Sequence, residues 1–426
     1  MALQRTPNLI RRSRESRIVG RVRPLSSHSG IQWSKCAMLF CILSSFASWA
    51  CAEAPERSGE PVRSDSAGVT VVLNGQADRM LDWTFQPIHD LGGASEGPTA
   101  FFRVFPTSIG VDSLGNLYVL DAGNYRISVF DRAGRHLRSF GQQGEGPGEF
   151  GFPSDMAVTP AGEVAVYDFA RRALVRFDEE GSYTGLVPLP GPLQRQVVFL
   201  HDGIIAAAVS QSTGGADSTD YRVLALGGDT VQIARVRQIS RLEPQRFSCM
   251  SHASPPYFGP RVIWAAGGNR IATSVDATYS IQVFEHSRLV AVWRRALPVI
   301  QSTLELAAWE VAEGDSLRFR GPVAGLRLDC AVPAEEAARK FGYADVVPIV
   351  KNLAITPEGG VWLRRRTDEP GELPIDVLDA TGGYVGTLPT RTPFPALFRG
   401  TNEIVSVETD EFGLPHVLVY RIEKGS

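Results

Sequence analysis

The sequence predicts an all-β fold, a six-bladed β-propeller made of four-stranded antiparallel blades. The first observation is a unit that occurs twice with a constant offset of 47 residues. Six positions show it: Pro106, Gly115, Asp121, Phe130, Asp131 and Gly134 recur as Pro153, Gly162, Asp168, Phe177, Asp178 and Gly181. The second is that each unit contains four short alternating runs between turn signals, which indicates four strands. Four antiparallel strands repeated at this length are typical of a propeller blade.

The blades follow one another along the chain with decreasing clarity. We expect them at residues 106–141, 153–191, 197–236, 261–297, 349–390 and 397–422. The third is weakly marked, so five or seven blades are the alternatives to six. The last has only three strands, whereas Trp83–Leu91 is a strand without a blade of its own. The N-terminal strand is therefore expected to complete the last blade and close the ring, which removes two unpaired sheet edges.

Two insertions interrupt the ring. Residues 238–260 are rich in Pro and aromatic residues, and residues 300–345 contain two helical patterns, 304–313 and 333–341. The second pattern begins near Pro333 with Glu335 and Glu336 in its first turn, as helix starts favour. Both insertions precede an innermost strand, so both should emerge on the same face of the ring.

The first 52 residues indicate export. They contain eight Lys/Arg and one acid, and the run from Cys36 to Ala52 carries no charge. A basic region, an apolar run and a small-residue site describe a signal peptide. Cleavage and release is one outcome, a lipid on Cys51 a second, and an uncleaved anchor a third. Residues 53–75 are expected to form a linker with a short strand, and residues 76–426 the propeller, in the periplasm, on the outer-membrane surface or outside the cell.

The charge of the body excludes nucleic acid as a partner. Without residues 1–52, 35 Lys/Arg stand against 45 Asp/Glu (43 less 8 and 46 less 1), a net charge of −10. Proteins that bind nucleic acid normally carry a basic patch, which this composition does not provide. We expect a monomer that reaches a membrane only through its signal segment or a lipid on Cys51.

The segment from Gly110 to Pro153 resembles the NHL repeat. The resemblance lies in the Gly115-Asn116 turn, Asp121, the run Asn124–Ile127, Phe130-Asp131 and the loop Gly144–Phe150. The second unit departs from the pattern because Arg171 and Ala173 stand where Asn124 and Arg126 stand in the first. The resemblance covers about a fifth of the chain. It implies a propeller of an exported bacterial type, commonly six-bladed, that serves as a binding module and in a few relatives as an enzyme.

Antiparallel strand order places the candidate site on one rim. The hairpins between second and third strands, the crossings between blades and both insertions share a face, and loops on a rigid scaffold commonly carry function. The candidate binding residues on this rim are Asp121, Asn124, Arg126, Glu145, Glu149, Asp168, Arg171, Arg172, Tyr257, Phe258 and Trp309. Tyr257, Phe258 and Trp309 are the expected exposed aromatic anchors for a partner.

Several of these residues have a structural interpretation as well. Asp121 and Asp168 could belong to a carboxylate ring that holds calcium, but aspartates that cap turns are the favoured interpretation. Arg126 is expected to pair with an acid of a neighbouring blade. No cofactor is predicted, with calcium as the one alternative. Cys249 and Cys330 are the candidate disulfide of an exported protein, and two separate thiols are the alternative.

The sequence thus predicts an exported, non-catalytic propeller that binds a protein, peptide or saccharide on its loop-rich face. The alternative is a metal-dependent lyase or lactonase with its site in the central channel. No catalytic or metal-ligating residues are assigned, because the seven histidines are scattered and no HExxH or CxxC motif occurs.

Overall fold

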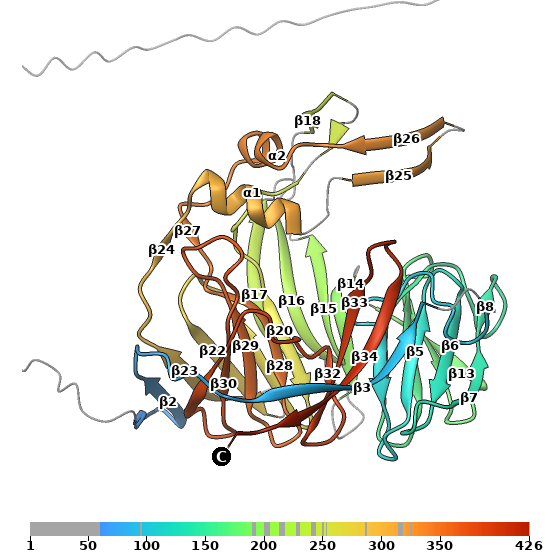
Figure 1. The fold of residues 1–426 in the computed structure, drawn as a ribbon, viewed down its shortest axis with the longest axis horizontal. Helices are drawn as coiled ribbons and strands as arrows, with labels where there is room; N and C mark the ends of the chain where they lie inside the picture. The colour runs from blue at the N-terminus through green and yellow to red at the C-terminus, as the bar shows by residue number, and fades with distance from the viewer. Residues whose placement is uncertain are drawn as a thin grey trace, which may run out of the picture. The chain divides into compact units, whose positions relative to one another are not determined.

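The structure of the protein is a computed structural model. It describes residues 60–93, 96–189, 193–199, 205–212, 218–226, 231–239, 244–248, 251–252, 254–285, 288–313, 318–323 and 326–425. The predicted signal peptide and Cys51 lie outside them. Within these residues the fold is an all-β propeller whose small sheets form a ring (Figure 1). No helix among them is long and apolar enough to cross a membrane.

Six sheets make up the ring, in chain order. Blades one to three are β4 (Ile109–Val111), β5 (Leu117–Asp121), β6 (Arg126–Phe130), β7 (His136–Phe140); β10 (Pro153–Val158), β11 (Val164–Asp168), β12 (Ala173–Phe177), β13 (Tyr183–Pro188); and β14 (Leu193–Phe199), β15 (Ile205–Ser212), β16 (Ser218–Leu226), β17 (Val231–Ile239). Blades four and five contain β20 (Ile263–Gly267), β21 (Arg270–Ser274), β22 (Ser280–Glu285), β23 (Arg288–Arg295); and β28 (Val350–Ile355), β29 (Val361–Arg365), β30 (Ile375–Leu378), β31 (Tyr384–Leu388). Blade six contains β32 (Leu397–Phe398), β33 (Glu403–Thr409), β34 (Pro415–Glu423) and β3 (Thr84–Gly92).

The innermost strands close the ring by contact. Each of β4, β10, β14, β20, β28 and β32 touches the next, and β32 touches β4 again. Side chains pack between adjacent sheets, so that Phe150 from the crossing after blade one is fully buried among residues of blades one and two. The second strands of blades one and two are buried along their whole length, as in Leu117–Asp121, while the outermost strand β7 is largely exposed. In blade one, therefore, the outermost strand faces the solvent.

The predicted closure by the N-terminal strand is confirmed. β3 pairs antiparallel with β34, from Thr84 opposite Glu423 to Gly92 opposite His416. His416 Nδ1 and Asp90 Oδ1 also lie 2.7 Å apart across this pair. The strand from the beginning of the propeller thus becomes the outermost strand of its last blade.

The segment before β3 does more than the sequence predicts. Residues 53–68 are predicted as a linker, yet β1 (Val62–Ser66) and β2 (Val69–Asn74) form a hairpin whose second strand pairs parallel with β23. β1 escapes prediction because all five of its side chains are exposed, so no apolar alternation marks it. Blade four is consequently a six-stranded sheet.

Residues 62–92, which we call the N-terminal belt, run along the outer edges of three successive blades. β2 lies on blade four, the Leu81 amide donates to the Thr387 carbonyl of blade five at 2.9 Å, and β3 completes blade six. The Asn74 amide side chain links the first two, because Nδ2 donates to the carbonyls of Arg294 and Gly382 at 3.1 and 2.9 Å. The belt therefore joins blades that are distant in sequence.

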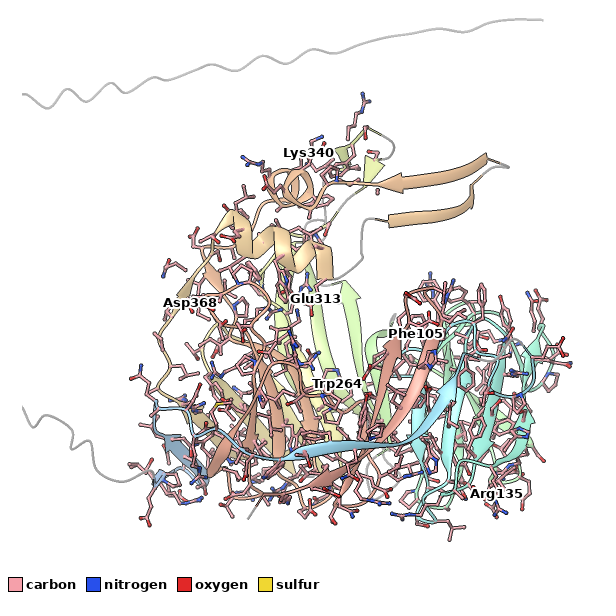
Figure 2. All side chains as sticks on the ribbon, in the orientation of Figure 1. Phe105, Arg135, Trp264, Glu313, Lys340 and Asp368 are labelled. Carbon is pink, nitrogen blue, oxygen red and sulfur yellow. The ribbon has the colours of Figure 1, made fainter. Side chains whose placement is uncertain are left out.

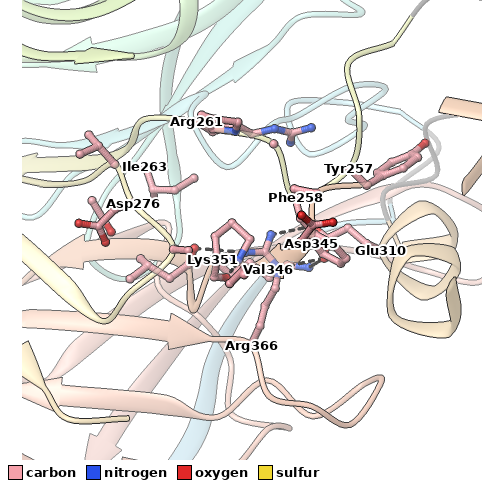
Figure 3. Close-up of a pocket in the computed structure, with 18 of the residues that line it drawn as sticks. Tyr257, Phe258, Arg261, Ile263, Asp276, Glu310, Asp345, Val346, Lys351 and Arg366 are labelled. Atoms are coloured by element: carbon pink, nitrogen blue, oxygen red, sulfur yellow. Dashed lines mark hydrogen bonds and ion pairs between the residues drawn. The ribbon is translucent and has the colours of Figure 1, made fainter. Parts of the chain in front are cut away.

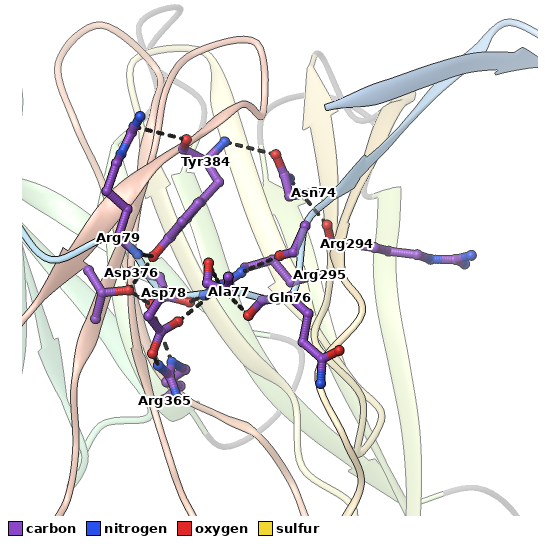
Figure 4. Close-up of polar contacts among 12 residues, drawn as sticks. Asn74, Gln76, Ala77, Asp78, Arg79, Arg294, Arg295, Arg365, Asp376 and Tyr384 are labelled. Atoms are coloured by element: carbon purple, nitrogen blue, oxygen red, sulfur yellow. Dashed lines mark hydrogen bonds and ion pairs between the residues drawn. The ribbon is translucent and has the colours of Figure 1, made fainter. Parts of the chain in front are cut away.

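A buried ionic cluster fastens the belt to blades four and five (Figure 4). We call Arg295, Asp376, Arg365 and Asp78 the clasp. Arg295 Nη1 lies 2.6 Å from Asp376 Oδ2, and both side chains are fully buried. Arg295 Nη2 reaches Asp78 Oδ1 of the belt at 2.9 Å, and Arg365 bridges the same two aspartates. The Arg295 guanidinium also stacks on Tyr384, 3.9 Å from its ring centroid.

Both predicted helices are present on the insertion between blades four and five. α1 (Leu304–Glu313) and α2 (Ala334–Phe341) are accompanied by a hairpin that the sequence does not predict, and the shorter strand pairs complete the connections. These remaining strands are β8 (Gln142–Gln143), β9 (Glu149–Phe150), β18 (Gln245–Arg246), β19 (Ser251–His252), β24 (Ile300–Gln301), β25 (Arg318–Val323), β26 (Leu326–Ala331) and β27 (Val346–Val347). Figure 1 shows both insertions on one side of the ring.

Candidate functional site

We call the side of the ring that carries the crossings, the second-to-third-strand hairpins and both insertions the insertion face. Figure 2 shows Glu313 and Lys340 on this side and Arg135, in a third-to-fourth-strand turn, at the opposite end. The predicted rim residues of blades one and two therefore share a face, as the strand order requires. Their contacts decide whether they are available to a ligand.

Asp121 has a structural role, because its hydrogen bonds connect the crossing before blade one to the hairpin that follows β5. Its side chain is fully buried and accepts hydrogen bonds from the amides of Phe102 and Arg103 in the preceding crossing at 3.0 and 2.9 Å. It also accepts from the amides of Gly123 and Asn124 at 3.1 and 3.3 Å and from Asn124 Nδ2 at 2.6 Å. These donors occupy the carboxylate oxygens, so Asp121 holds the crossing against the hairpin.

Asp168 repeats this arrangement one blade later. It is fully buried and accepts from the amides of Gly151 and Phe152 at 2.7 and 3.0 Å, and from Ala170 and Arg171 in its own turn. The repeated aspartate thus fixes each crossing to the following hairpin. No group of three or more His, Cys, Asp or Glu side chains that could hold a metal occurs among the described residues.

Blades one and two each place an arginine against the preceding crossing, but from different positions of the repeat. Arg126 Nη2 donates to the carbonyls of Gly97 and Ala100 at 2.8 and 3.4 Å, and not to an acid of a neighbouring blade as predicted. In blade two, where Ala173 replaces it, Arg171 Nη2 donates to the carbonyls of Gly144 and Gly146 at 3.3 and 3.2 Å. Either position lets an arginine reach the glycine-rich crossing, so the difference between the units preserves the contact.

The other loop residues differ in accessibility. Glu149 accepts from the Gly146 amide at 2.8 Å and from Gln142 Nε2 at 2.7 Å, and the hydrogen bond from Gly146 in particular lowers the pKa of its carboxyl. Glu145 and Arg172 are exposed. Arg172 has a φ of 53° in its turn, as Tyr125 has 56° at the equivalent place, so the two hairpins share a left-handed residue.

The aromatic residues of the insertions are not the exposed anchors that the sequence predicts. Tyr257 and Phe258 are each 8% exposed and pack with Phe341 of α2 and Leu306 of α1. Trp309 is half-buried, and Lys351 Nζ lies 4.9 Å from its ring centroid. The two insertions therefore bury these aromatic side chains in a common hydrophobic cluster, which also contains Phe247 and Val347.

A cavity of about 390 Å³ lies where the helical insertion covers blades four and five (Figure 3). Arg366, at the end of the second strand of blade five, is bound to Glu310 of α1 through Nη2–Oε1 at 2.7 Å and Nε–Oε2 at 3.1 Å. Lys351 joins the same carboxylate at 3.2 Å. Burial alone raises the pKa of Glu310, but the hydrogen bonds and charges of Arg366 and Lys351 outweigh it and lower that pKa to about 2.

A larger cavity of about 760 Å³ lies at the axis of the ring. Residues of blades one, two, four, five and six line it, and it shares Ile263, Lys351 and Asn352 with the smaller cavity. Phe105 and Trp264, both labelled in Figure 2, belong to its wall and come from blades one and four. Because they share these three lining residues, the two cavities adjoin, and we call them together the joined recess.

Sequence reasoning missed the charged residues of this recess. The signal that could have revealed them is the run Arg364–Arg366, three arginines at the end of a strand that is otherwise apolar. That place in blade five corresponds to the places of Asp121 and Asp168. Charged residues at the C-terminal end of a blade's second strand therefore indicate the insertion face.

The candidate disulfide is not decided by these contacts. Cys249 lies outside the described residues, and Cys330 is described only through its backbone in β26, opposite Phe319. The pairing of the two cysteines therefore stays a prediction.

The chain is similar to one protein family and to several solved structures. A protein family described as a "6-bladed beta-propeller" matches residues 109–194, which are the first two blades. By sequence, the chain matches no curated protein. Similar solved structures are a protein of Bacteroides fragilis described as exported (13% identity, 83% of this chain and 100% of that one, TM-score 0.47), a member of the duf4221 family from Bacteroides vulgatus (10%, 87% and 100%, 0.42) and a gluconolactonase from Xanthomonas campestris (13%, 85% and 100%, 0.34).

Proposed function

We propose that this chain is an exported binding protein of the NHL-repeat type that holds a small ligand, such as a saccharide or the end of a peptide, in the joined recess of its insertion face. The observation that supports the proposal most is the recess itself. Its two parts, of about 390 and 760 Å³, have the size of ligand pockets, which commonly measure about 300–1,000 Å³. Export rests on the basic and apolar segment at the N-terminus.

A recessed site favours a small ligand over a broad protein interface. The aromatic side chains that could have anchored a protein partner, Tyr257 and Phe258, are buried beneath the helices. The wall of the smaller cavity instead combines apolar residues with Arg366, Lys351 and Glu310, held in fixed positions by their mutual ion pairs. A few fixed polar groups in an apolar wall orient a ligand and provide specificity.

The test is to fill the recess without disturbing the fold. Asn352 lines both cavities, is half-buried and makes no side-chain hydrogen bond among the described residues, so Asn352→Trp places an indole in the lining that the two cavities share. Leu114→Trp is the matched control, because Leu114 is 77% exposed in a turn on the opposite face. Purified protein is applied to arrays of saccharides and short peptides, and melting temperatures are recorded for all three proteins.

We expect wild type and Leu114→Trp to capture the same ligands, and Asn352→Trp to bind them at least tenfold more weakly with an unchanged melting temperature. Equal binding by a folded Asn352→Trp protein would place the ligand elsewhere and contradict the proposal. Stoichiometric zinc or calcium in the purified protein, together with turnover of a captured ligand, would favour the enzymatic alternative.

A further inference from the structure

Arg364 is the arginine of blade five that has no carboxylate partner. Its neighbours in the run are paired, Arg365 with Asp78 and Asp376, and Arg366 with Glu310. Arg364 has no acidic oxygen within 4.0 Å among the described residues, and its one side-chain hydrogen bond runs from Nη2 to the Thr392 carbonyl at 3.3 Å. Its guanidinium carbon lies 4.9 Å from the centre of the Phe394 ring, so the side chain is held against the crossing between blades five and six.

This guanidinium lines the axial cavity and is largely withdrawn from water. Nε is buried and has no hydrogen-bond partner within the described part of the chain. Burial lowers the pKa of Arg364, and the carboxylate that acts against this effect, Glu313, is already paired with Lys351. A buried charge without a counter-charge is costly, because the surrounding protein does not replace its hydration.

Trp264 contributes to the same lining, but its ring packs in a hydrophobic cluster with Ile271 and Phe284, so it offers the cavity an apolar surface. The polar recognition group is therefore Arg364. An arginine side chain only donates hydrogen bonds, so it favours a ligand with acceptor oxygens. A carboxylate offers two such oxygens, and its negative charge would provide the counter-charge that is missing near Arg364.

We infer that the axial cavity binds a ligand with a single carboxylate, and that Arg364 provides its counter-charge. This inference rests on the proposed binding function and names the chemistry of the ligand. Asp155 and Glu408 also line the cavity, where Glu408 Oε1 accepts from Ser406 Oγ at 3.1 Å and from Tyr420 Oη at 3.0 Å. Lys351 and Arg391 line it as well, so three cations stand against two carboxylates and the lining carries a net charge of +1. One carboxylate neutralises this charge, whereas a polyphosphate or a nucleic acid would exceed it.

The carboxylate can come from an acidic sugar or from a peptide C-terminus, and paired probes separate these sources. Binding to the full-length protein is measured by calorimetry for glucuronate against glucose, and for N-acetyl-dialanine against its C-terminal amide. We expect at least one carboxylate probe to bind about tenfold or more tightly than its neutral partner, as a charge-assisted hydrogen bond of about 1.5–3 kcal/mol implies. The probe pair that shows the preference identifies the source.

Arg364→Met keeps the packing on Phe394 and removes the charge. In this variant the dissociation constants of the carboxylate probe and its neutral partner should differ by no more than about twofold. Arg364→Lys, which keeps a charge but no fork, should retain part of the preference. Arg135→Met removes one positive charge from an 81%-exposed side chain on the opposite face and should leave the preference intact. Lack of preference in wild type, or a preference that survives in Arg364→Met, would overturn the inference.

The outcome is distinguishable from failure of the proposed function. If Asn352→Trp abolishes binding while Arg364→Met leaves it unchanged, the recess is the binding site and the carboxylate assignment is wrong. If Asn352→Trp leaves binding of every probe unchanged, both the site and the assignment are wrong.

Discussion

Replacing Asp376 by asparagine should release the N-terminal belt. Asp376 is fully buried and accepts from Arg295 Nη1 at 2.6 Å, from Arg365 Nε at 3.2 Å and from Thr387 Oγ1 at 2.7 Å. The amide of asparagine has the same shape but offers one acceptor oxygen, and its NH₂ group would face a donor. Arg295 would keep only Asp78 as a counter-charge, whose side chain is 38% exposed and therefore screened.

The magnitude follows from the burial of this pair. Removing one partner of a buried ion pair leaves an uncompensated charge and costs about 3–5 kcal/mol. At an m-value of about 3 kcal/mol per M for a chain of this size, the midpoint of urea unfolding should fall by about 1 M or more. The matched control is Glu335→Gln, which breaks the exposed Glu335–Arg339 pair of α2 and should cost less than about 0.5 kcal/mol.

Hydrogen exchange locates the effect. The amides of β2 should exchange faster in Asp376→Asn than in wild type, while those of β11, far from the clasp in sequence, should change less, because local opening follows the contacts that are lost. A midpoint within about 0.3 M of wild type, with unchanged exchange in β2, would show that pairing of β2 with β23 holds the belt without the clasp.

Three further predictions concern single carboxylates. The free energy of unfolding of Glu310→Gln should be about 3 kcal/mol lower than that of wild type above pH 4.5. This difference should vanish as the pH falls toward 2, because a carboxyl with a lowered pKa in the folded state stabilises the fold only above that pKa. Urea unfolding at several pH values measures the difference. Asp121→Asn and Asp168→Asn should each destabilise by about 2–4 kcal/mol, because buried amides lose their acceptor, and calcium should not raise the melting temperature of wild type. The hydrogen bond to Asp90 raises the pKa of His416, so its contribution to closure is present at low pH and lost as the pH rises through that pKa; an NMR titration should show the pKa return toward 6.5 in Asp90→Asn.

The blades can be predicted from the sequence because the blades of the paired units bury the same kind of residue at equivalent positions. The buried second strands β5 and β11 have apolar side chains at every position but the last, and each ends in the aspartate that fixes the crossing. The closing strand could be found by counting, since three strands at one end and a single strand at the other complete a sheet. These features are local or repeated, so one sequence is enough to see them.

The belt could not be predicted in the same way. Its pairing with β23 joins residues about 220 positions apart, such as Asn74 and Arg294, and its first strand has no buried face. The clasp joins Asp78, Arg295 and Asp376 from three separate segments. Charged residues near the ends of strands are common on any surface, so only their spatial convergence shows that all three are paired and that Arg295 and Asp376 are buried.

The same reasoning explains why the repeat pattern led to structural residues when it was searched for a binding site. A structural contact that recurs from blade to blade uses residues at equivalent positions of the repeat. Asp121 and Asp168 are such residues, and their hydrogen-bond partners are amides of the protein itself. A ligand in an axial cavity meets several blades at once, and it is recognised by what differs among them. Arg364 and Asn352 occur in blade five beside an insertion, outside the paired units, and line a wall that five blades share. In a ring built from repeats, the positions where a blade departs from its neighbours are therefore the better candidates for ligand recognition, and the Arg364→Met and Asn352→Trp variants apply this criterion directly.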